Sequence, residues 1–191
     1  MSQSTFHVII VGGSVAGLSL AHMFERADIK YTLLEARDTI SPSLGASIVI
    51  MPNGARILDQ LGIYDEMSCI MTRMRRTFTR RSDGRLVSGN KWPSLVRKKL
   101  GYSAEICERK VFLRSMFNQL KDKSRVCLGK KVVAMEHLDG GIRVVCEDGG
   151  MFTGDLVIGA DGIHSKTRKE MQKFAEETGS EGLINKDKNS K

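Results

Sequence analysis

The sequence is poor in the residues that mark several specialised classes of protein. Only three of its 191 residues are proline, one is tryptophan, and all aromatic residues together make up 6%. Hydrophobic residues account for 41% and charged residues for 27%, an ordinary globular composition that excludes a fibrous or wholly disordered chain. A chain of this length can bury one good-sized core, or one domain with a fragment of another.

Cysteine and histidine are few and scattered. No C-x-x-C pair occurs, which argues against a zinc site and against a dense disulfide framework, and favours a reducing compartment. The histidines show no ligand spacing either, so we expect no metal centre. The residues concerned are Cys69, Cys107, Cys127 and Cys146, with His7, His22, His137 and His164.

Long apolar runs are also lacking. The first five residues contain no basic region, and the apolar run from Val8 to Val11 is too short for the core of a signal peptide or for a membrane span. We therefore expect neither a secretory signal nor a membrane segment in this chain, and a cytoplasmic location.

The formal net charge of +8 raises the question of an anionic partner. Much of the charge lies in residues 73–85 and in the lysine-rich tail. The first of these segments alternates as strands do around a turn at Ser82-Asp83-Gly84, with Phe78 as its one aromatic residue and no stacking platform. We expect no nucleic-acid binding here, but a basic hairpin that is either solvated or forms an anion-attracting rim.

The start of the chain predicts one βαβ unit. Residues 6–11 form an apolar run typical of a parallel strand that is covered on both faces, and glycines end it. Apolar residues then recur at helical spacing over residues 15–27, and residues 31–35 form a second short strand. Strand, glycine turn, helix and strand in this order indicate an α/β fold with a mostly parallel sheet.

Further elements follow along the chain. Helices are expected at residues 55–61, ending at Gly62, and at 111–120. Strands are expected at 131–135, 141–146 and 156–158. These elements predict a domain over residues 1–172 with a basic hairpin insertion near 73–104, and a polar, disordered tail over 173–191.

The glycine turn after the first strand has the residue pattern of a dinucleotide site. Such a site needs glycine for a sharp turn, a small residue where backbone meets pyrophosphate, and a glycine where helix and strand pack closely. Here Ser14 stands where the G-x-G-x-x-G pattern has its middle glycine, and an acid that can bind ribose follows at the end of the second strand. The candidate cofactor-binding residues are Gly12, Gly13, Ser14, Ala16, Gly17 and Glu35.

A second string, D-G-I-H-S-K-T-R, begins at Asp161. It resembles the second fingerprint of the FAD-dependent monooxygenases related to para-hydroxybenzoate hydroxylase, a strand followed by Asp-Gly-x-x-Ser-x-x-Arg. The resemblance implies a Rossmann-like FAD-binding fold with part of an antiparallel substrate-domain sheet. It also implies that Asp161 and Gly162 lie at the flavin pyrophosphate. Ser165 is expected to cap the following helix, and His164 to be a loop residue.

Two more segments resemble this family. The Glu-Arg before the helix at 111–120 is similar to its element whose arginine reaches FAD, which implicates Arg109. The segment L-G-A-S-I-V-I-M-P-N-G resembles the one whose backbone passes the cofactor, which implicates Gly45, Ala46 and Val49. Within this family, the members from fungal secondary metabolism are the most similar in sequence, through V-G-G-S-x-A-G-L and G-A-S-I.

The resemblance implies a monooxygenase in which NADPH reduces FAD and one oxygen atom passes to a small organic substrate, by hydroxylation or epoxidation. The family's third motif, G-D-A-x-H, does not occur in the sequence, so we expect a truncated enzyme, with its C-terminal half either absent or supplied elsewhere, and assign no catalytic residue. One alternative is an inactive FAD-binding remnant of such an enzyme. Another is a simple NAD-binding Rossmann reductase, which leaves the second string unexplained.

Overall fold

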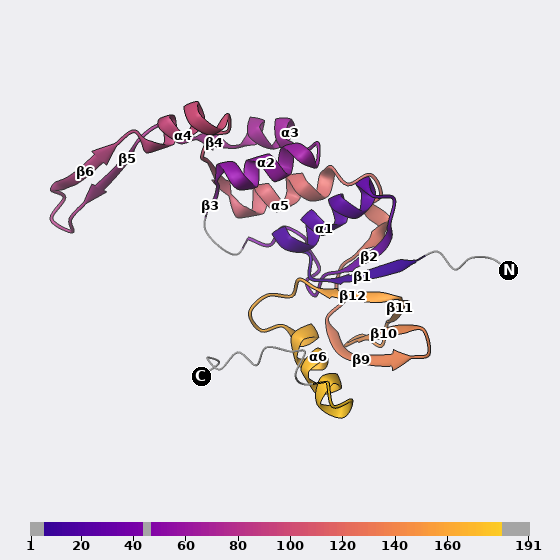
Figure 1. The fold of residues 1–191 in the computed structure, drawn as a ribbon. Helices are drawn as coiled ribbons and strands as arrows, with labels where there is room; N and C mark the ends of the chain where they lie inside the picture. The colour runs from indigo at the N-terminus through magenta and orange to yellow at the C-terminus, as the bar shows by residue number, and fades with distance from the viewer. Residues whose placement is uncertain (1–5, 44–46, 181–191) are drawn as a thin grey trace. The chain divides into compact units, whose positions relative to one another are not determined.

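The structure, a computed structural model, describes residues 6–43 and 47–180. The chain folds as two compact units (Figure 1). The described residues of unit 1 are 6–40 and 122–180, and those of unit 2 are 41–43 and 47–121.

Unit 1 is built on a four-stranded parallel sheet in the order β12-β1-β2-β8 (Figure 1). Its strands are β1 (His7–Val11), β2 (Lys30–Leu34), β8 (Val126–Cys127) and β12 (Leu156–Gly159). β1 is central: Ile9 pairs with Val157 on one side and with Thr32 on the other. Helix α1 (Val15–Arg26) connects β1 to β2, which confirms the predicted βαβ unit.

The two faces of this sheet are covered by different structures. Ile10, on one face of β1, lies toward α1, where Leu18 and Ala21 are fully buried. Ile9 and Val11, on the opposite face, pack in a second cluster with Val132, Val144 and Cys146. The latter residues belong to an antiparallel sheet in the order β11-β10-β9, with β9 at Val132–Leu138, β10 at Gly141–Cys146 and β11 at Met151–Gly154. Burial on both faces explains why β1 is continuously apolar.

The last described helix of unit 1 is α6 (Lys166–Glu177). It extends past residue 173, where the sequence predicted the start of a disordered tail. Its i,i+4 ion pairs, Lys166 with Glu170 and Lys173 with Glu177, support helix in a segment whose polarity alone favoured disorder. Residues 181–191 lie outside the described residues.

Unit 2 contains a three-stranded antiparallel sheet in the order β3-β7-β4, with β3 at Ser47–Ile50, β4 at Thr72–Arg73 and β7 at Glu105–Glu108. Its helices are α2 (Pro52–Gln60), α3 (Tyr64–Ile70), α4 (Trp92–Leu100) and α5 (Arg109–Asn118). α2 starts three residues before its predicted position because Pro52, which lacks an N–H, suits the first turn of a helix.

The basic hairpin is present as β5 (Thr77–Arg80) and β6 (Leu86–Asn90), which pair antiparallel around the predicted turn. The rest of the expected insertion is not hairpin. α4 follows β6 at once, with Pro93 in its first turn and Gly101 in the left-handed conformation at its end. Neither α3 nor α4 was predicted, because each is short, with seven and nine residues.

Candidate functional site

Three predicted site segments meet at one edge of the parallel sheet in unit 1. Because β1, β2 and β12 run parallel, the turns at their carboxyl ends lie at the same edge, where α/β folds bind ligands. Two backbone hydrogen bonds tie these turns together. The Gly12 N–H donates to the Leu34 carbonyl at 2.8 Å, and the Ala160 N–H donates to the Val11 carbonyl at 2.7 Å.

The glycines of the first turn are required by close backbone packing. Gly12 has φ +108°, and a Cβ built on it would lie 2.5 Å from the Ala160 carbonyl oxygen. A Cβ on Gly17 would lie 1.8 Å from the Gly12 carbonyl oxygen. Both contacts are to backbone, which cannot move aside as a flexible side chain can. The turn therefore holds the start of α1 directly against the end of β1, as the glycine pattern predicted.

The start of α1 has the properties of an anion site. Ser14 is its extended N-cap residue, and the first helical hydrogen bond runs from Leu18 N–H to the Ser14 carbonyl at 2.9 Å. The N–H groups of residues 15–17 precede that bond, so the helix supplies no acceptor for them. The first turn carries no acidic residue, and Ala16 is exposed there. Unpaired N–H groups and the positive end of the helix dipole favour a phosphate at this point.

Glu35 is fixed against the glycine turn. It follows β2 directly and is buried, with 6% of its surface exposed. Its Oε2 accepts from the Gly13 N–H at 2.7 Å, and its Oε1 accepts from the Arg37 N–H at 3.0 Å. The Arg37 guanidinium lies 3.4 Å from Oε1. The predicted acid and the predicted turn are thus one hydrogen-bonded unit, which holds the carboxylate at the sheet edge.

Asp161 is held at the neighbouring turn, after β12. Its Oδ1 accepts from the Ser165 hydroxyl at 2.6 Å, and its Oδ2 accepts from the Thr167 N–H at 3.0 Å and hydroxyl at 3.2 Å. Burial acts to raise the pKa of Asp161, but the donated hydrogen bonds, from the Ser165 hydroxyl first and then from backbone N–H groups, outweigh it and lower that pKa. Asp161 is therefore an anchored carboxylate that organises the start of α6.

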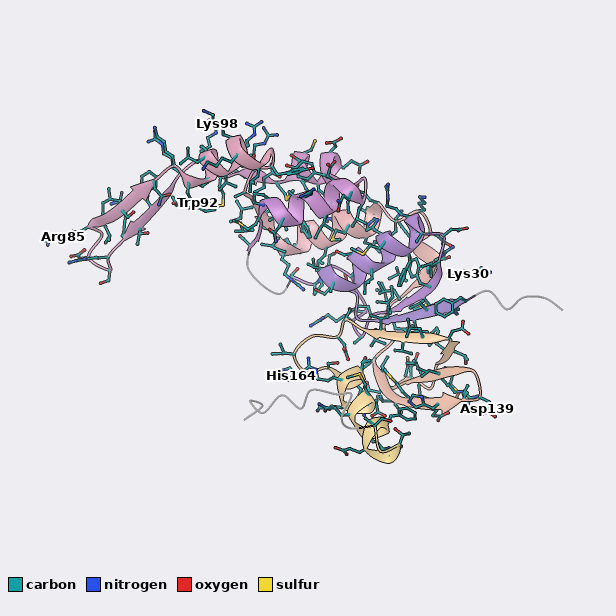
Figure 2. All side chains as sticks on the ribbon, in the orientation of Figure 1. Lys30, Arg85, Trp92, Lys98, Asp139 and His164 are labelled. Carbon is teal, nitrogen blue, oxygen red and sulfur yellow. The ribbon has the colours of Figure 1, made fainter. Side chains whose placement is uncertain are left out.

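Ser165 caps α6 as predicted, because its hydroxyl accepts from the Arg168 N–H at 2.9 Å. Gly162, beside Asp161, has φ +81°, a conformation that favours glycine. His164 is an exposed residue of the turn before α6 (Figure 2). The two strings that carried the sequence argument thus form adjacent loops of one sheet edge.

The remaining predicted site residues belong to unit 2 or are not described. Val49, on β3, pairs with Ile106 and is 43% exposed. Arg109 is the first residue of α5 and is partly buried. Gly45 and Ala46 lie outside the described residues. The roles of these four residues stay predictions.

Four residues of the site in unit 1 were not singled out from the sequence. Ala160 directly precedes the second string and Thr167 lies within it, but neither was assigned a role. Arg37 and Ile40 had no signal: the first donates to Glu35, and the Ile40 Cδ1 lies 2.6 Å from the position of a Cβ on Gly13. Over residues 6–43 and 47–180, no group of three or more metal-ligating side chains is arranged to hold a metal ion.

Comparisons with known proteins show which family the chain belongs to. The family described as "FAD binding domain" matches residues 5–185. The FAD-dependent monooxygenase prhF of Penicillium brasilianum is 45% identical over 175 residues, which are 92% of this chain and 37% of that protein. The FAD-dependent monooxygenase penE of Penicillium thymicola is 44% identical over 184 residues, 96% of this chain and 38% of that protein. The chain thus spans less than two fifths of the length of these relatives.

Solved structures of monooxygenases and of a FAD complex have a similar fold. Klebsiella pneumoniae HpxO, complexed with FAD and uric acid, is 27% identical with a TM-score of 0.76, over 87% of this chain and 41% of that one. The p-nitrophenol 4-monooxygenase PnpA of Pseudomonas putida DLL-E4, at 21% identity and a TM-score of 0.76, covers 87% of this chain and 44% of that one. The second likeness concerns the fold alone.

Proposed function

We propose, since the chain belongs to the FAD-binding domain family, that it is the cofactor-binding portion of a FAD-dependent monooxygenase. One observation supports this above all others. The glycine turn, the buried Glu35 and the Asp161 loop occupy one edge of a parallel sheet and are tied together by backbone hydrogen bonds.

The residues at this edge fit FAD. A cradle without side chains exists at Gly12 and Gly17, where a Cβ would meet backbone, and it brings the N–H groups of α1 within reach of a pyrophosphate. Glu35 would accept hydrogen bonds from a ribose, with its position fixed by Gly13 and Arg37. Asp161 and Gly162 would line the pyrophosphate from the neighbouring loop.

When bound, FAD supplies the redox chemistry of the reaction. The described residues bind and orient it. Glu35 and Asp161 are hydrogen-bond acceptors already engaged by N–H and O–H donors, which suits them to holding a cofactor rather than to moving protons. We assign no general acid or base to this chain.

The finer parts of the function are proposals of the same kind. We propose NADPH as the electron donor, and a small organic molecule of secondary metabolism as the substrate of the whole enzyme. The fungal relatives support the metabolic setting. The four free cysteines support the cytoplasm as the compartment.

Replacement of Ala16 tests the cofactor site without disturbing the fold. Ala16 is exposed in the first turn of α1, so Ala16→Glu places a carboxylate where we expect the pyrophosphate. An acid at a helix N-terminus is itself favourable, so the variant should be at least as stable as the parent chain. Ala16→Gln is the matched control of nearly equal size.

The measurement is FAD binding by the purified 191-residue chain. The readout is the visible flavin spectrum that remains with the protein after gel filtration. We expect the parent and Ala16→Gln to retain FAD, and Ala16→Glu to weaken binding at least tenfold. A folded parent chain that stays colourless would contradict the proposal, as would equal FAD affinity in all three proteins.

A second experiment concerns the chain in isolation. We propose that these 191 residues hold FAD but do not complete substrate oxygenation, because they span 37–38% of the length of the fungal relatives. Supplied with NADPH and FAD, the chain should consume NADPH without forming oxygenated product, or not consume it at all. Efficient NADPH-dependent oxygenation by this chain would overturn that part.

A further inference from the structure

The backbone of Glu35, the carboxylate that we assign to the cofactor ribose, is held as well as its side chain. The Glu35 N–H donates to the Cys127 carbonyl at 2.9 Å, and the Glu35 carbonyl accepts from the Lys130 N–H at 2.8 Å. Both bonds come from residues 127–130, called here the bracing loop. The position of this loop therefore determines where Glu35 lies.

The bracing loop follows a very short strand. β8 pairs with β2 over only two residues, Leu33 with Val126 and Leu34 with Cys127. Gly129 then takes φ +68°, and the chain turns toward the start of β9. So short a ladder fixes the start of the loop but not its end, which depends on contacts outside the parallel sheet.

The side chain of Lys130 supplies such a contact. Its ammonium group forms an ion pair with the carboxylate of Asp148, in the turn between β10 and β11. The hydrogen bond between the two groups raises the pKa of Lys130 and lowers that of Asp148, so both are charged at neutral pH. Asp148 is itself fixed, because its Oδ1 accepts from the Gly150 N–H at 3.0 Å.

A second ion pair joins the same two segments and offers a comparison. The Lys131 Nζ lies 2.8 Å from the Glu147 Oε1. These side chains are 59% and 62% exposed, against 27% and 43% for Lys130 and Asp148. Of the two lysines, Lys130 is the one whose N–H donates to Glu35. The two pairs thus differ in their connection to the candidate site.

We propose that Lys130 is a positioning residue for the cofactor: its ion pair with Asp148 holds the bracing loop, and through it Glu35, where the carboxylate meets the adenosine ribose of FAD. This inference rests on the proposed function, since it assumes that FAD binds at Glu35. A binding group has to be held within about 0.5 Å of its productive position by the contacts behind it. An exposed ion pair adds little stability, so its loss should show in ribose recognition rather than in unfolding.

The test compares FAD with an analogue whose adenosine ribose lacks the 2′-hydroxyl. Each is titrated into the purified 191-residue chain, and binding is followed by flavin fluorescence. In dinucleotide sites of this fold, the acid at the end of the second strand accepts a hydrogen bond from that hydroxyl. The parent chain should therefore bind FAD about tenfold more tightly than the analogue.

Two variants break the ion pair from either side. Lys130→Met removes the ammonium group and keeps the length of the side chain. We expect it to weaken FAD binding about fivefold but analogue binding less than about twofold, because the analogue lacks the hydroxyl that Glu35 recognises. Asp148→Asn should act in the same direction. Lys130→Arg keeps a cation that can pair with Asp148, and should keep the preference for FAD.

Two further proteins serve as controls. Lys131→Met makes the same change in charge and size one residue further on, and should leave both affinities within about twofold of the parent. Lys130→Met combined with Asp148→Asn should bind FAD no more weakly than Lys130→Met alone, since both substitutions remove one interaction. Urea denaturation of each variant confirms that it is folded.

Each outcome decides the proposal. Equal losses of FAD and analogue affinity in Lys130→Met would overturn it, because the role would then be structural only. An unchanged preference in Lys130→Met, or the same loss in Lys131→Met, would reject it as well. A parent chain that binds FAD and the analogue equally would reject this inference and leave the FAD-binding function standing. A folded parent chain that binds no FAD would reject both.

Discussion

The glycine turn of unit 1 and the basic segment of unit 2, which comprises residues 73–100, both depend on glycine, but for different reasons. In the turn, a Cβ on Gly12, Gly13 or Gly17 would lie 2.6 Å or less from another atom. In the basic segment and at its end, Gly84 and Gly101 have nothing within 4 Å of such a Cβ and are required only by φ values of +84° and +80°. Glycine serves close packing in the first region and backbone conformation in the second.

The difference extends to the polar groups. The carboxylates beside the glycine turn, Glu35 and Asp161, each accept several hydrogen bonds at fixed positions. Most cations of the basic segment have no such partner within the described chain. A region whose groups satisfy one another is sensitive to substitution, whereas a region whose groups face solvent tolerates substitution better.

The largest expected effect is that of Gly17→Ala. Its new methyl group would lie 1.8 Å from the Gly12 carbonyl oxygen, so α1 must shift away from β1. We expect the free energy of unfolding to fall by about 3 kcal/mol or more, measured by urea denaturation. Gly101→Ala is the control, and should cost only about 1 kcal/mol for the left-handed backbone. Similar losses in the two variants would remove the distinction between packing and conformation.

Glu35→Gln should give the next largest effect. The substitution removes the charge and turns an amide N–H toward either the Gly13 N–H or the Arg37 N–H, which now face a carboxylate oxygen. We expect the free energy of unfolding to fall by about 2 kcal/mol and FAD affinity to fall roughly tenfold or more. Flavin fluorescence titration measures the second quantity. Glu136→Gln, which alters an exposed ion pair with Arg143, should change neither quantity appreciably.

Asp161→Asn sharpens the comparison through its pH dependence. The pKa of Asp161 is lowered in the folded chain, so its contribution to stability is present above the unfolded value of about 4 and is lost as pH falls through the folded value. Asp161→Asn should therefore be less stable than the parent by about 1 kcal/mol at neutral pH, with the difference shrinking toward pH 3 and below.

The control for that experiment is Asp139→Asn, which removes one carboxylate from the exposed end of β9 and β10 (Figure 2). Urea denaturation at neutral and acidic pH gives both comparisons. A deficit in Asp161→Asn that stays constant across this range would show that the Asp161 carboxylate does not stabilise the loop through its charge.

The smallest effect is expected in the basic segment. Arg81→Gln and Lys91→Gln alter exposed side chains that have no ion-pair partner among the described residues, so the free energy of unfolding should change by less than about 0.5 kcal/mol. Thermal denaturation followed by circular dichroism is sufficient to detect a larger change. A loss comparable to that of Glu35→Gln would show that the segment is a structural part of unit 2.

Much of unit 1 was predictable because its signals are local. The apolar run of β1 and the helical period of α1 predicted the βαβ unit. Residues 173–177 were wrongly assigned to a disordered tail, because the stacking of Phe174 on His137 and the burial of Ala175 depend on tertiary packing. In unit 2 the turn of the basic hairpin was recognised, while α3 and α4 were not. α4 has only nine residues, carries a proline at its second position and buries only Pro93, so its sequence is difficult to distinguish from that of a loop.

The sequence by itself determined the type of site, because the spacing of the glycines, of Glu35 and of the Asp161 string follows from one strand-turn-helix geometry. Only the tertiary structure decided what each of these residues contacts. It brought the Gly13 N–H to Glu35 and the Ala160 carbonyl to Gly12. Hydrogen-bond partners and steric limits depend on small differences in the distance between segments that are far apart in the chain. Those distances are set when β2 and β12 pair on either side of β1, and no local pattern encodes them.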